Sequence, residues 1–468
     1  MEKITEHGCP RIGYYLPHHP VLKEDNLTTK LRVVFDASLK TSTGISLNDT
    51  LMIGPTIQED LWNIILRFRI WSYVMSADAE KMYRQVCVDD SQTHYQRILW
   101  RTNPHEEIET FELKTVTYGT ASASYLATRA LEETAKAEKT NFPLGAASIL
   151  SDFYVDDLLT GDNNLDKAIK TRDEIIAALS KGGFKLRKWI SNSSKLLQGL
   201  RSSETSESVL VLNKGEQHKT LGLHWHASLD LLQYDVTRTT SARSVTKISI
   251  LANIARIFYP LGLLGPIIVT GRILLQRLWI LKLDWDETVP LEIETRWRTY
   301  EAQLSLLNTL KILRRVVASS QTNVIELHGF CDASLDAYGA AIYIKSIDHK
   351  GHGEARLLCA RSRVAPVKTI TLPRMEFCAA HMLALLTHKV SQALNIKFDG
   401  IYHWTDSMIV LGWIKSDAKR WSIYVSNRVG QIQELTHPSS WRHTNTKENP
   451  ADLTSRGMPP SQLIQSTL

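Results

Sequence analysis

A polar stretch near residue 320 divides the chain into two regions, and this division constrains the fold most strongly. Before it, residues 31–225 alternate short apolar runs with helical patterns, and residues 237–317 are mainly helical and basic. After the polar residues 319–323, a strand begins at Ile325 and opens the order strand, strand, strand, helix, strand, helix. A chain of 468 residues exceeds one ordinary hydrophobic core. We therefore predict an α+β and α/β protein of several domains, at residues 1–230, 231–320 and 324–468.

The composition narrows the class of protein. Hydrophobic residues make up 43% and charged residues 22%, the balance of a globular rather than a disordered chain. The net charge of +6 suits a polyanionic partner, although many globular proteins are equally basic. The five cysteines include no C-x-x-C pair, which disfavours a disulfide framework or a zinc site and fits a reducing compartment. The most apolar stretch, residues 257–271, contains Pro and Gly and is shorter than the ~20 residues of a membrane span.

In the first region, two acidic sequences follow apolar runs. Asp78 closes the apolar run 73–77, and Asp156 and Asp157 lie between apolar residues in a pattern that fits a hairpin with the acids at its tip. Phosphoryl transfer needs carboxylates that hold two divalent ions about 3.5–4 Å apart. Each sequence alone is more often a strand cap or a solvated turn. Their combination, order and separation indicate a metal-dependent phosphoryl-transfer site.

Several motifs around these acids resemble one family. Residues 154–157, Tyr-Val-Asp-Asp, resemble the Tyr-X-Asp-Asp box of reverse transcriptases, and residues 77–85 resemble their first catalytic motif. Residues 14–21, 31–38, 183–189 and 221–225 narrow the resemblance to the Pol polyprotein of Pao/BEL-type long-terminal-repeat retrotransposons. The resemblance runs almost end to end. It implies a right-hand polymerase with partial fingers, a palm and a helical thumb or connection, followed by a ribonuclease H-like mixed-sheet domain.

The resemblance also implies roles for residues of the polymerase region. Asp78, Asp156 and Asp157 would form the metal-binding triad, with Asp157 the most tolerant of the three. Tyr83 would lie under the incoming sugar, where its ring excludes the 2′-hydroxyl that distinguishes RNA from DNA building blocks. A buried core aromatic is the alternative for Tyr83. Residues 221–225 would grip the primer.

Three further residues would contact the nucleotide. Arg32 would bind the triphosphate through charge-assisted hydrogen bonds. Lys188 would approach the leaving pyrophosphate, although neighbouring basic residues compete and an exposed strand face explains its charge as well. Gly119 would allow a close backbone approach in the template-and-nucleotide motif. In this motif the usual Ser-Pro pair is replaced by Ala123-Ser124, which puts turnover rather than the fold in doubt.

The second region contains a second series of acids. Asp332 and Asp406 end strands, Glu376 lies in the first turns of a helix opened by Pro373, and Asp452 follows an Asn-Pro-Ala sequence. Singly, such acids are ordinary caps. In this order they resemble the two-metal site of the ribonuclease H fold. His443 fits a final strand better than a mobile catalytic loop, and we leave it out of the catalytic set.

Together these patterns predict an RNA-directed DNA polymerase with ribonuclease H activity. The expected cofactor is Mg²⁺ or Mn²⁺, with two ions at each active site. The expected partners are an RNA template, a DNA primer, an RNA–DNA hybrid and deoxynucleoside triphosphates, without a membrane, in an intracellular, cytoplasmic particle. Few residues precede Arg32 and no protease signature is present, so we expect a slice of a longer polyprotein. The alternatives are a domesticated, inactive nucleic-acid-binding fragment, or a chain whose ribonuclease H half alone is active.

Overall fold

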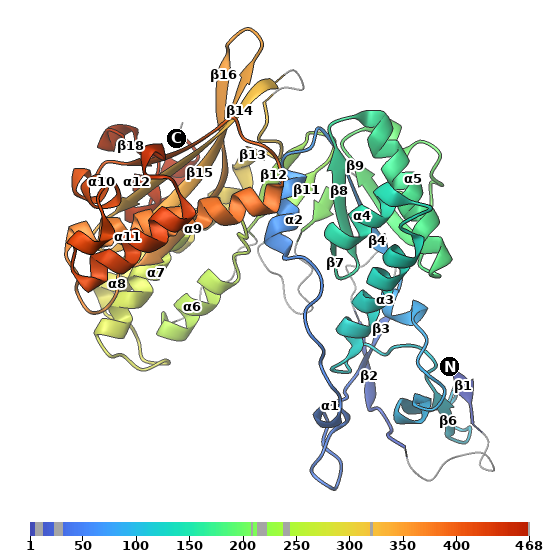
Figure 1. Ribbon diagram of the computed structural model, residues 1–468. Helices are drawn as coiled ribbons and strands as arrows, with labels where there is room; N and C mark the ends of the chain where they lie inside the picture. Colours follow the sequence, from blue (N-terminus) through green and yellow to red (C-terminus); the bar gives the residue numbers. More distant parts are fainter. Residues whose placement is uncertain are drawn as a thin grey trace.

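The computed structural model describes residues 1–4, 13–22, 31–206, 209–212, 222–236, 244–318 and 322–466. Two lobes meet at a central junction, and an extension that contains the N-terminus projects from one of them (Figure 1). The lobe nearer the N-terminus carries the first series of acids, and the C-terminal lobe carries the second.

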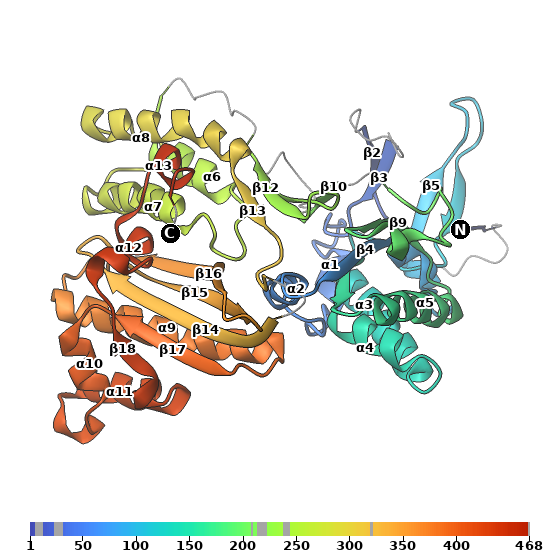
Figure 2. The ribbon, with the colours of Figure 1, turned by 90° about the horizontal axis from the view of Figure 1, so that it is seen from above.

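The N-terminal lobe is built on a four-stranded antiparallel sheet with the order β7-β8-β4-β9. Its strands are β4 (Tyr73–Ala79), β7 (Phe153–Tyr154), β8 (Asp157–Asp162) and β9 (Leu186–Ser191). Helices α3 (Ala123–Glu138), α4 (Pro143–Ser151) and α5 (Leu165–Lys181) pack together beside it (Figure 2). Asn164 caps α5 by accepting from the Lys167 backbone N–H, and the buried residues of α5 recur at helical spacing.

The extension consists of short strands with a small core of its own. The antiparallel pair β2 (His18–Leu22) and β3 (Leu31–Phe35) lies near a sheet of β1 (Glu2–Lys3), β6 (Glu109–Glu112) and β5 (Arg97–Trp100). Helix α1 (Leu47–Thr50) begins at a capping box formed by Ser46 and Asp49. Leu16, Phe35 and Ile98 form part of the core that holds these pieces together.

The middle of the chain combines strands and helices. Strands β10 (Val209–Val211), β11 (Gly222–His226), β12 (Leu231–Asp235) and β13 (Lys311–Leu313) form one antiparallel sheet. Helices α6 (Lys247–Ala255), α7 (Gly265–Ile280) and α8 (Leu291–Gln303) follow. Residues 231–320 are therefore not purely helical, and the limit predicted at residue 230 falls between two paired strands, β11 and β12. The apolar stretch 257–271 is buried as expected, and none of the described helices meets the length and hydropathy that a bilayer crossing requires.

The C-terminal lobe contains a mixed five-stranded sheet with the order β16-β15-β14-β17-β18. The first three strands, β14 (Thr322–Ala333), β15 (Ala337–Asp348) and β16 (Gly353–Val364), form an antiparallel meander. Strand β17 (Gly400–Thr405) adds in parallel to β14, and β18 (Trp441–His443) adds in parallel to β17. Helix α9 (Leu372–Leu394) covers one face, followed by α10 (Met408–Ile414) and α11 (Ile423–Leu435).

Helix α7 covers the opposite face of this sheet together with α12 (Asp452–Arg456), as Figure 2 shows. Val269 and Ile273 of α7 pack with Ala337 of β15, and Gly262 approaches Ala360 so closely that a Cβ would lie 1.8 Å from its carbonyl oxygen. The helices after residue 246 thus share a core with the C-terminal sheet. Helix α13 (Pro460–Leu463) ends the described elements.

Two buried arginines make hydrogen bonds at the junction of the lobes, next to the C-terminal end of helix α2 (Leu61–Phe68). Arg69 donates to the carbonyl oxygens of Arg314 at 3.0 Å and of Leu358, on β16, at 2.6 Å. Arg314, completely buried, donates to both carboxylate oxygens of Asp230 at 2.6 and 2.7 Å. Burial lowers the pKa of Arg69 to about 10, which still leaves it charged at neutral pH.

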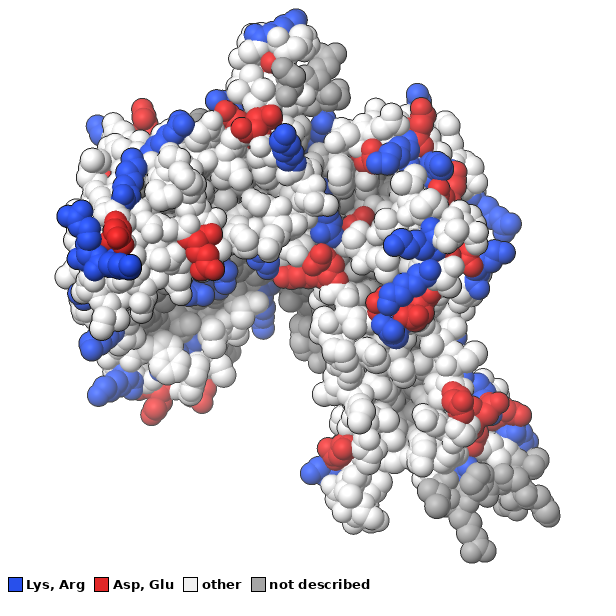
Figure 3. Space-filling model, in the orientation of Figure 1, with Lys and Arg blue, Asp and Glu red and all other residues white. Residues whose placement is uncertain are grey.

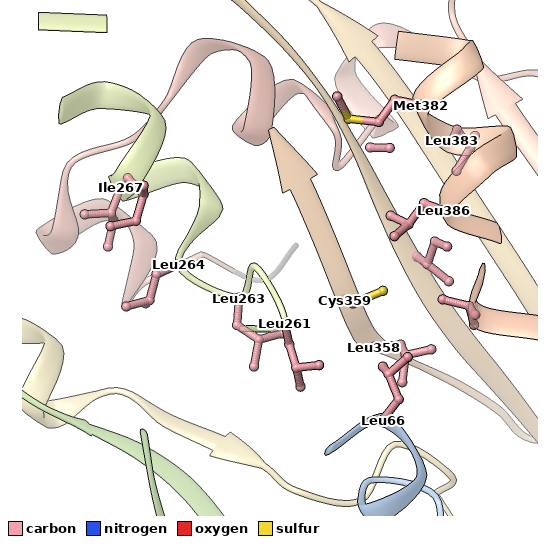
Figure 4. Packing of buried hydrophobic residues seen from close by; sticks show 14 of the residues in the cluster. Leu66, Leu261, Leu263, Leu264, Ile267, Leu358, Cys359, Met382, Leu383 and Leu386 are labelled. Atoms are coloured by element: carbon pink, nitrogen blue, oxygen red, sulfur yellow. The ribbon is translucent and has the colours of Figure 1, made fainter. Parts of the chain in front are cut away.

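The apolar core is continuous across this junction. Figure 4 shows Leu66 of α2 against Leu358 of β16, with Leu261 and Leu263 from the segment before α7 nearby. A continuous core and several buried hydrogen bonds favour a fixed arrangement of the lobes. The distance between the two series of acids is therefore set by the fold.

Candidate active sites

Asp78 and Asp157 face each other across the central strands of the first sheet. They are direct partners in the β4–β8 ladder, where opposite Cα atoms lie about 4.5–5.5 Å apart. Asp156 occupies the turn between β7 and β8, and its carbonyl oxygen accepts from the Ala79 N–H at 2.8 Å. The predicted hairpin tip is therefore formed, and it brings all three acids of the first series together.

The turn that carries Asp156 has an unusual backbone. Val155 has φ of 55°, a conformation that β-branched residues rarely adopt. The side chain of Gln58 holds this peptide from both sides: its Oε1 accepts from the Val155 N–H at 2.7 Å, and its Nε2 donates to the Val155 carbonyl at 3.4 Å. Gln58 lies 97 residues away in sequence and no local pattern identifies it. It is a positioning residue for the turn.

Lys188 reaches the same group of acids from β9. Its Nζ lies 3.2 Å from Asp78 Oδ2. Lys188 has φ of 55° and lies where the β4–β9 register shifts, between the pairs Asp78–Arg187 and Ser76–Ile190. The irregularity interrupts the alternation of the strand, and Lys188 contacts the acid. Arg187, one competing residue, instead pairs with Glu80 at 2.6 Å.

Tyr83 lies half-buried in the 3₁₀ turn η2 (Met82–Gln85), which follows β4. Its hydroxyl is 3.3 Å from the hydroxyl of Ser124, at the start of α3. Ser124 is the residue that replaces proline in the template-and-nucleotide motif, so the departure from the family pattern contacts the expected sugar-binding residue. Tyr83 is neither a fully buried core aromatic nor fully exposed.

The turn at Gly119 requires glycine. Its φ is 95°, and a Cβ would lie 2.4 Å from the carbonyl oxygen of Phe35. Asn48 fastens this turn from outside, donating to the Gly119 carbonyl at 3.1 Å and accepting from the Ala121 N–H at 2.7 Å. Asn48 is a second positioning residue that the sequence motifs do not reveal.

Arg32 is exposed on β3, at the edge of the extension. Its guanidinium carbon lies 5.4 Å from the centre of the Tyr118 ring, and that of Arg84 lies 5.5 Å from the same ring. Arg84 comes directly after Tyr83 and was not among the predicted residues. In the predicted primer grip, Leu221 lies outside the described residues, and Trp225 is completely buried against Phe68.

In the C-terminal lobe, Asp332 and Asp406 leave neighbouring parallel strands at the same level. Phe330 and Trp404 are parallel partners, and each aspartate follows two residues later. The pKa of Asp332 is raised to about 6. Burial raises this pKa most, a hydrogen bond from Ser455 lowers it, and the charges of Asp406 and Asp452 raise it further. Asp406 also accepts from the Thr446 hydroxyl at 2.8 Å.

Glu376 joins this group from the first turns of α9, which begins at Leu372, one residue before the predicted start at Pro373. Burial raises the pKa of Glu376, a hydrogen bond with Ser407 lowers it, and the charge of Asp406 raises it. Asp406 therefore interacts electrostatically with both Asp332 and Glu376. A negative charge that raises the pKa of neighbouring carboxyl groups, as that of Asp406 does for Asp332 and Glu376, is typical of a site that gathers carboxylates for a cation.

Asp452 begins helix α12 and completes the second series. Asn449, 1% exposed, ties this segment to the end of β14 by donating to the Cys331 carbonyl at 3.1 Å, and it accepts from the Ala451 N–H at 3.2 Å. Asp452 pairs with Arg456, one turn further along the helix. His443 ends β18, the final strand that the sequence predicts for it.

Both groups offer carboxylate oxygens, the hard donors that Mg²⁺ and Mn²⁺ prefer. Within the described ranges, no three or more His, Cys, Asp or Glu side chains are already arranged to hold a metal ion. Several of the acids instead contact Lys188, Thr446, Ser455 or Arg456. The carboxylate oxygens are donors of the kind that Mg²⁺ or Mn²⁺ takes, and the number of ions at each group stays a prediction.

Comparisons with known proteins define the class. The chain resembles a foamy viral protease-reverse transcriptase in complex with double-stranded DNA, with a TM-score of 0.56 and 14% identity over 93% of this chain and 66% of that one. It also resembles a foamy viral protease-reverse transcriptase in complex with an RNA/DNA hybrid, with a TM-score of 0.51 and 14% identity. This similarity covers 93% of this chain and 51% of that one. The fold is thus that of a reverse transcriptase, and the chain spans less than two thirds of the length of these proteins.

The match to a protein family covers a shorter part of the chain than the structural similarity does. Residues 246–407 match the family described as Pao retrotransposon-like RNaseH-like domain, and this span includes α6, α7 and α8 as well as β14–β17. Together with the fold, it confirms the resemblance to a Pao/BEL-type Pol region that the motifs predict. No curated protein is significantly similar in sequence to this chain.

Proposed function

We propose that this chain extends a DNA primer on an RNA or DNA template and cuts the RNA strand of the resulting RNA–DNA hybrid. The observation that carries the proposal is the pairing of Asp78 with Asp157 across β4 and β8, with Asp156 in the adjoining turn. A second, separate group of acids at the ends of β14 and β17 supports the nuclease activity.

Each group would hold two Mg²⁺ or Mn²⁺ ions. Asp78, Asp156 and Asp157 would bind them at the polymerase site. At the nuclease site the ligands would be Asp332, Glu376, Asp406 and Asp452. When bound, such ions activate the attacking oxygen and stabilise the leaving oxygen of an in-line displacement.

The chain's own residues would orient the substrates. Lys188 and Arg32 offer cationic groups for the triphosphate, and the ring of Tyr83 would exclude a 2′-hydroxyl from the sugar position. Gly119 allows the backbone to approach closely, and Asn48 holds that turn in place. Because such contacts are to phosphate and shape, binding should depend weakly on sequence and strongly on salt.

Nucleic-acid partners are supported by the similar solved structures, whose proteins are bound to double-stranded DNA and to an RNA/DNA hybrid. A domesticated, inactive fragment is the less favoured function. All seven predicted metal ligands are intact carboxylates, and decay of the sequence would have no reason to spare them together.

The test is a pair of assays on the parent protein, each with Mg²⁺ or with EDTA. One measures extension of a DNA primer on an RNA template, and the other measures cleavage of a preformed RNA–DNA hybrid. We expect both reactions with Mg²⁺ and neither with EDTA. Hybrid binding without either reaction, at any Mg²⁺ or Mn²⁺ concentration, would identify the inactive fragment instead.

A further inference from the structure

A basic pocket lies at the junction of the two lobes, apart from both groups of acids. Its volume is about 430 Å³, and its walls come from the start of α2, helix α7 and the segment before it, strand β16 and helix α9. Four cationic side chains line it: Arg272, Arg361, Arg363 and Lys389. Among the described residues in its walls, Asp60 is the only acid. The pocket therefore carries a clear excess of positive charge.

Two of these cations are held by aromatic and acidic neighbours. Lys389 Nζ lies 3.0 Å from Asp60 Oδ2 and 4.4 Å from the centre of the Trp62 ring. Arg272 stacks over Tyr259, with its guanidinium carbon 5.7 Å from the ring centre. Arrangement by neighbouring rings reduces the entropy that these side chains lose when they bind an anion.

Arg361 and Arg363 are two of the exposed cations of the pocket, and both lie on the edge strand β16. They lie two residues apart, so their side chains leave the same face of the strand. Arginine's planar group of donors is well suited to the oxygens of a phosphodiester. The pocket thus offers two adjacent arginines for phosphate contacts.

The position of the pocket relates it to both groups of acids. Arg361 and Cys331 are both partners of Ala340, so Arg361 lies two strands, or about 10 Å, from the residue that precedes Asp332. On the other side, Asp60 follows closely after Gln58, which holds the turn at Asp156. Figure 3 shows Lys and Arg side chains, together with acidic ones, at the hollow between the lobes, below the junction.

We propose that this junction pocket binds the phosphate backbone of a nucleic-acid duplex that extends between the two groups of acids. The inference rests on the proposed function, because that function requires one duplex to reach both sites. It adds a specific binding site between them, with Arg361 and Arg363 as its phosphate ligands. Because such a site reads phosphates, it should hold duplexes of any sequence.

The test measures binding of an RNA–DNA hybrid in EDTA over a range of salt concentrations. The double variant Arg361→Gln/Arg363→Gln is compared with the parent and with a control of equal charge change, Lys139→Gln/Lys181→Gln, whose residues are exposed on the N-terminal lobe. Each lost phosphate contact reduces the slope of log affinity against log salt by about 1. We expect a reduction of about 2, with affinity lowered about 10-fold, for the arginine variant alone.

Two controls accompany this measurement. Unchanged thermal unfolding shows that the variant folds, and Arg361→Lys/Arg363→Lys should keep most of the salt dependence. If the parent cleaves hybrids and the Arg361→Gln/Arg363→Gln variant has the same salt slope and hybrid affinity as the parent, the inference is overturned while the proposed function stays intact. If the Arg361→Gln/Arg363→Gln variant loses pyrophosphate binding but keeps hybrid binding, the inference is also overturned, because the pocket then binds small anions. Failure of the parent to extend primers or cleave hybrids would count against the proposed function.

Discussion

Lys188 Nζ lies 3.2 Å from Asp78 Oδ2, and Lys188 contacts this carboxylate where the register of β9 shifts. A lysine at positive φ is uncommon, and keeping it there costs backbone strain of about 1–3 kcal/mol. Strain of this kind collects at functional sites, where surrounding structure maintains it. The contact places a cation beside the acids at the position expected for the phosphate groups of a nucleotide.

Replacing Lys188 should therefore slow nucleotide addition. Lys188→Asn suits the positive φ because asparagine tolerates this conformation, yet it removes the charge. We expect primer extension to fall about 10-fold, mainly through weaker nucleotide binding, with hybrid cleavage unchanged. Single-nucleotide extension kinetics measure this effect. The matched variant Lys185→Asn, on the same exposed segment, should extend normally; equal losses in both variants would contradict a specific role for Lys188.

Removing the amide of Gln58 should disturb the turn that carries Asp156. Gln58→Met keeps the length of the side chain but leaves the Val155 N–H and carbonyl without these partners. A loss of about 1–3 kcal/mol in holding the turn corresponds to roughly 10–100-fold slower extension. Hybrid cleavage serves as the internal control, because it depends on the other lobe. Normal extension by a folded Gln58→Met protein would show that the turn holds its conformation unaided.

Tyr83 should control the choice of sugar. Tyr83→Ala removes the ring expected beneath the incoming nucleotide, so ribonucleotide incorporation should rise at least 10-fold relative to deoxynucleotide incorporation. Tyr83→Phe keeps the ring and loses only the contact with Ser124, and it should discriminate like the parent. Competition between the two nucleotide types during primer extension gives the ratio. A parent that incorporates ribonucleotides as readily as deoxynucleotides would remove this role.

Asp332 should make the metal-free protein less stable at neutral pH. Burial, and then the charges of Asp406 and Asp452, raise the pKa of Asp332 to about 6 from its ordinary value near 4. A carboxyl whose folded pKa is raised destabilises the fold progressively as pH rises from about 4 to 6. In EDTA, Asp332→Asn should therefore be more stable than the parent at pH 7, by up to about 3 kcal/mol, and close to it near pH 4.

Thermal unfolding at both pH values measures this difference. Mg²⁺ should then raise the Tm of the parent more than that of Asp332→Asn, because ion binding to the folded state is lost in the variant. Asp336→Asn, an exposed neighbour, is the control and should behave like the parent. If Asp332→Asn is less stable than the parent at pH 7 in EDTA, the charged form of Asp332 does not destabilise the folded protein and the prediction is wrong.

The acids could be located from sequence because their signals are local. Asp78, Asp332 and Asp406 each follow a short apolar run, and a strand of this type places its terminal acid at the sheet edge. The strand at His443 and the helix around Glu376 also follow from local patterns. These elements are as predicted, within a few residues at their ends.

Residues that act across long sequence separations could not be found in this way. Gln58 holds a turn 97 residues away, and Arg69 bonds a carbonyl 289 residues away. Their own neighbours in sequence give no sign of these partners. Similarly, the apolar pattern of helix α7 does not predict which surface the helix covers, and its packing with Ala337 of β15 is seen only in the structure.

The most direct measurement compares Asp156→Asn and Asp332→Asn in both reactions. Each substitution removes one negative charge from one group of acids, which lie on separate sheets. We predict that Asp156→Asn abolishes primer extension and keeps hybrid cleavage, while Asp332→Asn abolishes cleavage and keeps extension. Both proteins must bind hybrid like the parent. If both folded variants carry out both reactions at parental rates, the assignment of two metal-dependent active sites to these acids is wrong.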